Sequence, residues 1–121
     1  MKHMKKLKKN IVKEINVPIY GCKITYIVTY DFIKTARKYK DELCLDSNEC
    51  RGLAFRLGGS RHSYMILVKP RYRKAWDTIA HEALHVANFI LEDRGIKGSY
   101  KNDEAQAYLL SYIIEEIQKI K

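Results

Sequence analysis

The chain has 121 residues, of which 46% are hydrophobic and 31% charged, and its formal net charge is +9. These values are typical of a single globular domain with a modest core. We expect neither a membrane span nor a signal peptide, because no stretch approaches roughly 18 consecutive apolar residues and the N-terminus lacks an apolar segment.

The first thirteen residues have the composition of a basic arm. Six lysines precede the first acidic residue, Glu14, and without them the chain has 17 basic and 14 acidic residues, a net charge of +3. We therefore predict an arm of residues 1–13 and a domain of residues 14–121. A solvated arm is the simplest interpretation. Its charge also allows contact with nucleic acid or an anionic membrane, although it has no aromatic residues for base stacking, and an amphipathic helix is a further alternative.

The residues after the arm have the pattern of a β-hairpin. Apolar residues alternate over residues 15–20 and again over residues 24–30, where β-branched and aromatic residues are frequent. Gly21 and Cys22 predict the turn between these strands. Pro18 indicates that the first strand lies at the edge of a sheet, because proline cannot donate a ladder hydrogen bond.

A short helix and a second hairpin follow. Residues 31–43 predict the helix, with Asp31 as its N-cap. Residues 50–57 and 64–69 predict two strands joined through Gly58-Gly59-Ser60. The second strand is so apolar that we expect it inside the sheet.

The three cysteines, Cys22, Cys44 and Cys50, form no C-x-x-C pair. An odd number without such a pair is typical of free thiols in a reducing compartment. We therefore expect a cytoplasmic protein. Any of the three could cap a metal ion in principle, but nothing in their spacing predicts it.

An amphipathic helix is predicted over residues 75–93, and Gly95 suits the left-handed position after its end. Its apolar stripe contains Trp76, Ile79, Ala83, Val86, Ala87 and Ile90. Its polar side contains Asp77, Thr78, His81, His85, Asn88 and Glu92. Both histidines are therefore expected to face away from the core.

The segment His81-Glu82-Ala83-Leu84-His85 matches H-E-x-x-H. On a helix the two histidines lie about 40° apart and one turn from each other, so both imidazoles can bind one metal ion. Zn²⁺ is the ion best suited to nitrogen and carboxylate ligands in an open tetrahedral site. It lowers the pKa of a bound water to about 7, and Glu82 can then take the proton of that water. The alternative is a surface helix with two solvated histidines.

A zinc site of this kind needs a third protein ligand. The continuation H-E-x-x-H-x-x-G-x-x-H is absent, because Asn88 and Leu91 occupy its Gly and His places. A second amphipathic helix opens just before Glu104, which follows His85 with eighteen residues between. Glu104 is the predicted ligand and Asp103 is the alternative. An acidic residue in a first helical turn also needs no role beyond the helix dipole.

Two further polar residues lie one helical turn from the predicted ligands. Asp77 can orient His81 through a hydrogen bond, and Tyr108 can contact Glu104 or polarise a substrate carbonyl. Each also has a simpler interpretation, Asp77 as an acid near a helix N-terminus and Tyr108 as a half-buried core residue.

The pair His81 and His85, with Glu104 beyond it, resembles the gluzincin branch of the zincin metallopeptidases. The small size and the sequence of residues 103–108 also resemble minimal single-domain gluzincins and short phage-encoded metallopeptidase-like proteins. The resemblance covers residues 52–119. Its motif is more specific for metal binding than for activity.

This resemblance implies that His81, His85 and Glu104 bind one Zn²⁺ per chain and that Glu82 is the general base. It also implies an α+β fold, a minimal zincin-like single domain. An N-terminal sheet of about four strands, antiparallel or mixed, would pack on the active-site helix and a C-terminal helix. The chain has no room for the second subdomain that walls the cleft of full-size gluzincins and supplies a Tyr or His to the oxyanion.

Two functions remain open from the sequence. The first is zinc-dependent hydrolysis of a peptide or protein, as a metalloendopeptidase in the cytoplasm of a bacterium or an infected host cell. The second is a catalytically weak or inactive, metal-stabilised protein-binding module on the same fold, which the small size and the basic arm favour. Glu82 favours hydrolysis, because metal binding alone does not require it.

Overall fold

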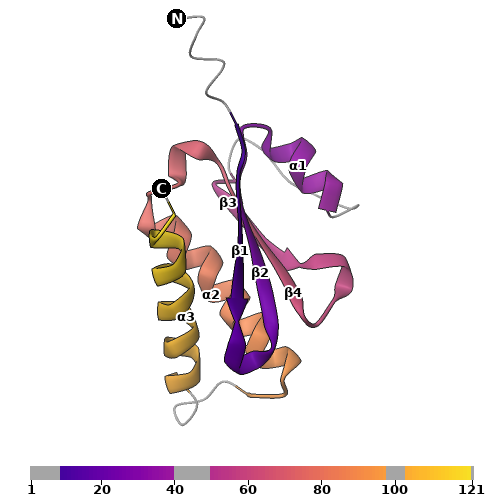
Figure 1. The fold of residues 1–121 in the computed structure, drawn as a ribbon, viewed down its shortest axis with the longest axis vertical. Coiled ribbons are helices and arrows are strands. Elements are labelled where there is room, and N and C mark those ends of the chain that lie inside the picture. Colours follow the sequence, from indigo (N-terminus) through magenta and orange to yellow (C-terminus); the bar gives the residue numbers. More distant parts are fainter. Residues whose placement is uncertain (1–8, 40–49, 98–102, 121) are drawn as a thin grey trace, which may run out of the picture.

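A computed structural model describes residues 9–39, 50–97 and 103–120. These residues form an α+β fold with a four-stranded mixed sheet (Figure 1), so the predicted fold class is confirmed. The strands are β1 (Ile11–Val17), β2 (Cys22–Val28), β3 (Gly52–Arg56) and β4 (Ser63–Val68). The helices are α1 (Phe32–Tyr39), α2 (Trp76–Asp93) and α3 (Asp103–Gln118). None of the described helices is long and apolar enough to cross a membrane.

The sheet has the strand order β1-β2-β4-β3. β1 and β2 are antiparallel, as are β3 and β4, and the two hairpins join through parallel pairing of β2 with β4. β4 is central and five of its six residues are buried, as its apolar sequence predicts. β1 and β3 are the edges, which agrees with the prediction from Pro18.

The first hairpin differs in detail from the prediction. β1 begins at Ile11, inside the residues assigned to the arm, because the sheet pairing extends to Val28 at the end of β2. Residues 1–8 of the arm lie outside the described residues. Pro18 ends the strand and opens a 3-10 turn at Pro18–Tyr20, since a proline at the first helical position needs no N–H. Gly21 then closes the turn with φ +60°, a conformation that favours glycine.

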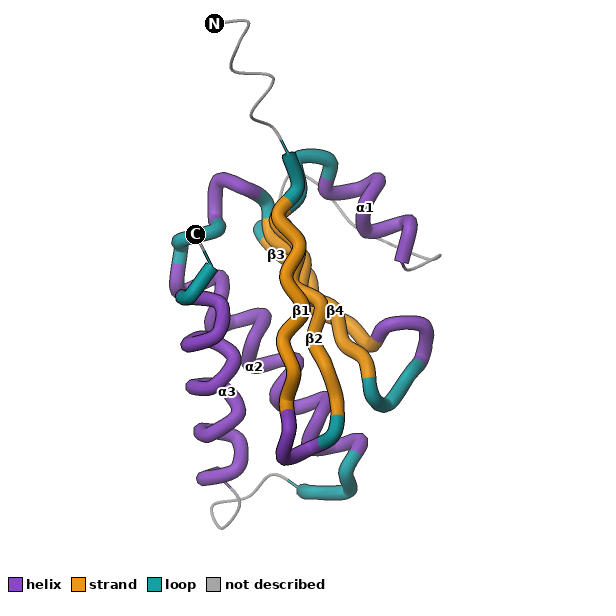
Figure 2. The backbone as a smooth tube through the Cα atoms, viewed as in Figure 1, coloured by secondary structure: helices purple, strands orange, loops and turns teal. Residues whose placement is uncertain are grey.

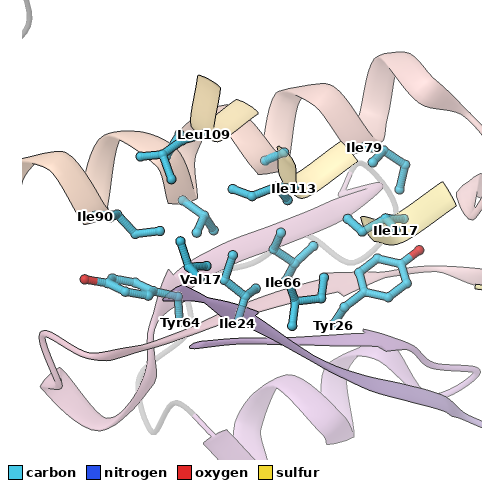
Figure 3. Packing of buried hydrophobic residues seen from close by; sticks show 14 of the residues in the cluster. Val17, Ile24, Tyr26, Tyr64, Ile66, Ile79, Ile90, Leu109, Ile113 and Ile117 are labelled. Carbon is cyan, nitrogen blue, oxygen red and sulfur yellow. The ribbon is translucent and has the colours of Figure 1, made fainter. Parts of the chain in front are cut away.

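Different helices cover the two faces of the sheet (Figure 2). Alternate side chains of β2 point to opposite faces of the sheet. Ile24 and Tyr26 pack towards α2 and α3, whereas Ile27 packs towards α1 with Phe32. The larger core therefore lies between the sheet and the two later helices (Figure 3).

α1 begins as predicted. Asp31 Oδ1 accepts a hydrogen bond from a backbone N–H group of the first helical turn at 3.3 Å. The predicted end of this helix at residue 43 lies outside the described residues, as does Cys44. Cys22, by contrast, is buried in the larger core as a free thiol.

α2 packs against the sheet with a face that its sequence predicted only in part. Its buried residues are Thr78, Ile79, Glu82, Ala83, Val86, Ala87, Ile90 and Leu91. The prediction was wrong for two residues of the first turn. Trp76, assigned to the apolar stripe, is 40% exposed, and Thr78, assigned to the polar side, is 5% exposed. For Thr78 the reason is the position of β3, which packs along α2 on the side where Glu82 lies against Gly52.

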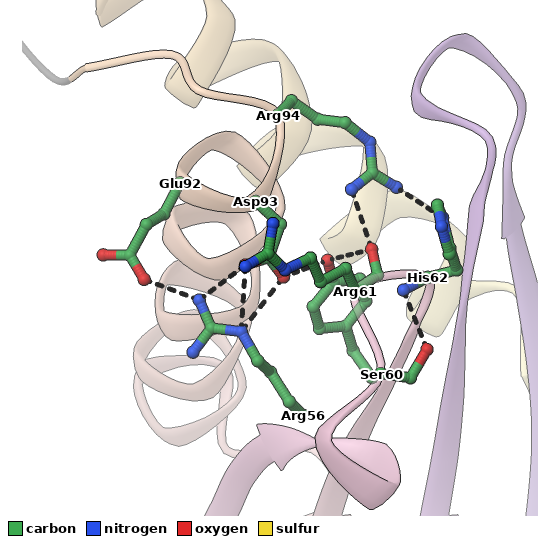
Figure 4. Close-up of polar contacts among 8 residues, drawn as sticks. Arg56, Ser60, Arg61, His62, Glu92, Asp93 and Arg94 are labelled. Carbon is green, nitrogen blue, oxygen red and sulfur yellow. Dashed lines mark hydrogen bonds and ion pairs between the residues drawn. The ribbon is translucent and has the colours of Figure 1, made fainter.

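Charged side chains fix the end of α2 to the second hairpin (Figure 4). Arg56 donates from Nε and Nη2 to the Asp93 carboxylate at 2.9 to 3.1 Å, and from Nη2 to Glu92 Oε1 at 2.6 Å. The Tyr64 hydroxyl donates to Asp93 Oδ2 at 2.6 Å. Burial alone raises the pKa of Asp93, but the hydrogen bonds from Arg56 and Tyr64 outweigh it and lower that pKa. We call these four residues the C-terminal clamp.

The residues after α2 extend this attachment to the first hairpin. Arg94 donates from Nε to the Tyr20 carbonyl oxygen at 2.9 Å and from Nη1 to the Arg61 carbonyl oxygen at 2.7 Å. Gly95 has φ +74°, the left-handed conformation predicted for it. The C-terminal end of α2 is therefore joined to both hairpins.

Candidate metal centre and adjoining cavity

His81 and His85 are exposed and lie one turn apart on α2, as predicted. Their rings meet edge to face, with centroids 4.7 Å apart, and their Nε2 atoms are 3.2 Å apart. Two nitrogen ligands at about 2.05 Å from a tetrahedral zinc ion are about 3.3 Å apart, so the separation of the two Nε2 atoms matches that expected for two ligands of this ion. The same distance also suits an N–H···N hydrogen bond between neutral imidazoles.

A row of side chains on the same face of α2 supports His85. Its ring stacks on Phe89, with 6.5 Å between centroids and 23° between planes. The Arg56 guanidinium lies 4.7 Å from the Phe89 centroid. Because Asp93 binds Arg56, the C-terminal clamp is connected through Phe89 to the His85 ring.

Glu82 lies on the buried side of α2. It is 8% exposed, and it packs so closely on Gly52 that a Cβ at position 52 would lie 3.1 Å from Glu82 Cγ. Burial raises the pKa of Glu82, and the charge of His81 lowers it in part. The carboxyl group is therefore held where water is scarce and where proton binding is favoured, which suits a general base and acid.

A cavity of about 370 Å³ adjoins His81. It lies between the start of β3 and the first two turns of α2, and its lining residues are Cys50, Arg51, Gly52, Asp77, Thr78, His81 and Glu82. Arg51 and Asp77 form an exposed ion pair at its rim, with Nη1 and Oδ2 3.7 Å apart. Because His81 and Glu82 also line the cavity, a molecule bound there would lie beside the candidate reacting groups.

Four lining residues, Cys50, Arg51, Gly52 and Thr78, were not predicted to belong to the site. The Cys50 thiol donates to the Gly52 carbonyl oxygen at 3.0 Å, and burial, followed by the charge of Glu82, raises its pKa. Thr78 Oγ1 is the one buried side-chain oxygen or nitrogen without a hydrogen-bond partner among the residues that the structure describes. Only tertiary packing brings Cys50 to α2, so the position of Cys50 in the sequence could not predict that it lines the cavity. Thr78 precedes Glu82 by one helical turn, and that spacing was visible in the sequence.

Glu104 is exposed in the first turn of α3. α3 packs alongside α2, and Gln106 Nε2 donates to Asn88 Oδ1 at 2.7 Å. Within the described residues, no three His, Cys, Asp or Glu side chains form a group that could hold a metal ion. The structure thus brings the two histidines together, and Glu104 or Asp103 as the third ligand stays a prediction.

The other polar residues considered from the sequence have contacts of their own. Asp77 contacts Arg51 at the cavity rim. Tyr108 is 46% exposed and stacks on Tyr112, with 6.2 Å between ring centroids. A role for Asp77 at His81, or for Tyr108 at a substrate, stays a prediction.

No protein-family model, curated protein or solved structure matches the chain. The resemblance to gluzincins therefore rests on the motif residues alone. The site combines a pair of imidazoles, a buried carboxyl group and a cavity, which is a set of groups suited to metal-assisted hydrolysis.

Proposed function

We propose that this protein is a zinc-dependent metallopeptidase, related in design to the gluzincins, that hydrolyses peptide bonds of a peptide or protein in the cytoplasm. The observation that carries the proposal is the 3.2 Å separation of the His81 and His85 Nε2 atoms next to the buried carboxyl group of Glu82. That separation suits two ligands of one tetrahedral zinc ion. The free thiols of Cys22 and Cys50 support a reducing compartment.

Three side chains would hold the metal in this proposal. His81 and His85 provide two ligands for one zinc ion per chain, and Glu104 is the third ligand that the gluzincin-like spacing predicts. The bound ion would supply Lewis acidity, which polarises the scissile carbonyl and acidifies the attacking water. The stacked rings of His85 and Phe89 would keep the ligand geometry fixed.

Glu82 moves the proton. Its carboxylate accepts a proton from the attacking water and returns it to the leaving amine. Burial supports this role, because a raised pKa makes the protonated form of Glu82 accessible nearer neutral pH than that of an exposed glutamate. A glutamine at this position would keep the shape of the side chain and lose the reaction.

The edge strand β3 supports binding of an extended substrate. β3 lies at one edge of the sheet and packs along α2, and its first residue, Gly52, contacts Glu82. A peptide that pairs with this edge gains main-chain hydrogen bonds and passes close to the histidine pair. The other edge, β1, is separated from β3 by the two central strands.

The metal content of the purified protein, measured by elemental mass spectrometry, tests the ligand set. We expect about one zinc ion per wild-type chain, much weaker retention in Glu104→Ala, and full retention in the matched variant Asp103→Ala. Full zinc retention in Glu104→Ala and weak retention in Asp103→Ala would instead identify Asp103 as the third ligand. Absence of zinc from the wild type after reconstitution would refute the proposal.

Cleavage of a quenched fluorescent peptide library tests the reaction. Glu82→Gln should retain zinc and lose on the order of 10²–10⁴-fold in rate, because only proton transfer is removed. The control Glu115→Gln, on the exposed face of α3, should cleave as the wild type does. Zinc binding without cleavage by the wild type would instead favour the metal-stabilised binding module.

A further inference from the structure

The cavity beside His81 contains a polar group that the fold leaves unused. Thr78 is 5% exposed, and its hydroxyl group has no hydrogen-bond partner. A buried hydroxyl in this state costs stability, because it has lost water and gained nothing in exchange. Thr78 lines the cavity, but its hydroxyl oxygen has almost no exposed surface, so the side chain must rotate towards a bound molecule before that molecule can supply the missing hydrogen bond.

We propose that this cavity binds a primary amide side chain, glutamine or asparagine, of the peptide substrate. The amide oxygen accepts a hydrogen bond from the Arg51 guanidinium at the rim, and the amide nitrogen donates to Thr78 Oγ1 once the Thr78 side chain has rotated towards the cavity. This substrate preference rests on the proposed peptidase function, whereas binding of the amide does not require hydrolysis.

The charges around the cavity favour an uncharged polar group. An acidic side chain would lie beside two carboxyl groups, those of Asp77 and Glu82. A basic side chain would pass Arg51 and would pair with Glu82, the group that the proposed reaction uses for the proton. An apolar side chain would leave the Thr78 hydroxyl unpaired. An amide supplies one acceptor and two donors without adding charge.

Arg51 can exchange its ion pair with Asp77 for a hydrogen bond to a bound amide. Its ion pair with Asp77 is long, at 3.7 Å, and both side chains are more than half exposed, so the pair contributes little. The guanidinium lies 5.3 Å from the Tyr72 ring centroid, and this contact can persist while an amide oxygen replaces the carboxylate.

The cavity lies where a substrate paired with β3 would pass. Its lining begins at Cys50 and Gly52, at the start of this edge strand. In an extended peptide, alternate side chains point to opposite faces, so only every second one can enter. The side chain that enters lies beside His81 and Glu82, and therefore close to the scissile bond.

Blocked single amino acids test the assignment without any need for cleavage. N-acetylglutamine methylamide and its norleucine, glutamate and lysine counterparts would be titrated into the full chain. Binding would be followed by ¹H–¹⁵N NMR at the backbone amides of Gly52, Thr78 and Glu82. We expect the glutamine probe to bind about tenfold more tightly than the norleucine probe, the effect of one neutral hydrogen bond. Equal or tighter binding of any other probe would overturn the assignment.

Two substitutions of Thr78 separate binding from folding. Thr78→Val removes the hydroxyl and keeps the branched shape, so the preference for glutamine should disappear while the urea midpoint of unfolding stays the same or rises. Thr78→Ser should retain the preference. If the preference survives in Thr78→Val, or if that variant unfolds at lower urea, the hydroxyl does not act as proposed.

The probes also separate this inference from the peptidase proposal. If the glutamine probe binds as expected but no peptide is cleaved, the amide site stands and the peptidase proposal fails. If peptides are cleaved without preference for glutamine or asparagine beside the bond, the peptidase proposal stands and the amide site is refuted.

Discussion

At the C-terminal end of α2, Asp93 accepts hydrogen bonds from Arg56 and Tyr64, whereas near the N-terminal end Thr78 is buried with its hydroxyl unpaired. The C-terminal end is tied to both hairpins. The N-terminal end follows Ala75, which provides no side-chain cap, and borders the cavity. One helix therefore has an end where polar groups satisfy one another and an end where they do not.

This difference indicates that the two ends of α2 have different roles. Paired and partly buried charges at one end hold the helix in position and stabilise the fold, and Arg56 is connected to His85 through Phe89. Unpaired or desolvated groups at the other end reduce stability and are available for a ligand or a proton. Changes at the C-terminal end should therefore act mainly on the free energy of unfolding.

Removal of the Asp93 carboxylate should have the largest effect. Asp93→Ala leaves the Arg56 guanidinium, 28% exposed, without its main partner, so we expect a loss of about 3 kcal/mol in the free energy of unfolding. Urea denaturation measures this loss. Glu92→Ala is the matched control, because the Glu92 side chain is 75% exposed, and it should cost less than about 1 kcal/mol. Equal costs for the two variants would contradict the clamp.

A methyl group at position 52 should have the next largest effect. In Gly52→Ala the new Cβ would lie 3.0 Å from the Leu67 carbonyl oxygen and 3.1 Å from Glu82 Cγ, and the oxygen belongs to rigid backbone. We expect a loss of about 2 kcal/mol, typical of overpacking, measured by urea denaturation. A change below about 0.5 kcal/mol would show that β3 and α2 can separate at low cost.

Acid should weaken the C-terminal clamp by a smaller amount. The folded-state pKa of Asp93 is lowered, so its stabilising contribution is complete above the ordinary aspartate pKa of about 3.9 and is lost as pH falls through the folded-state value. The difference in unfolding free energy between wild type and Asp93→Asn should therefore be constant from pH 7 to 5 and shrink below about pH 4. A difference that stays constant down to pH 3 would rule out this titration.

Periodicity within one element was sufficient to predict several features. It placed His81 and His85 on one exposed face of α2. This prediction succeeds because a helix fixes the angle between residues a few positions apart. Both hairpins were predicted for the same reason, since their turns are local.

Features that depend on distant segments were not predictable. The burial of Glu82 and Thr78 follows from the position of β3, and the sequence gives no register between a strand and a helix that it packs on. The same reason applies to Cys50, which joins the cavity through that packing. Trp76 shows the converse, because an apolar residue at a helix end can remain partly exposed.

The parallel pairing of β2 with β4 has a consequence for the order of folding. Each hairpin closes through a short turn, but the central pair must bring Lys23 to Ser63 across the intervening chain, which costs loop-closure entropy before any contact repays it. We therefore expect docking of the two hairpins to be the slow, non-local step. The cavity and the histidine pair belong to residues 50–97, on one side of that junction, so their elements are neighbours along the chain before the sheet is complete.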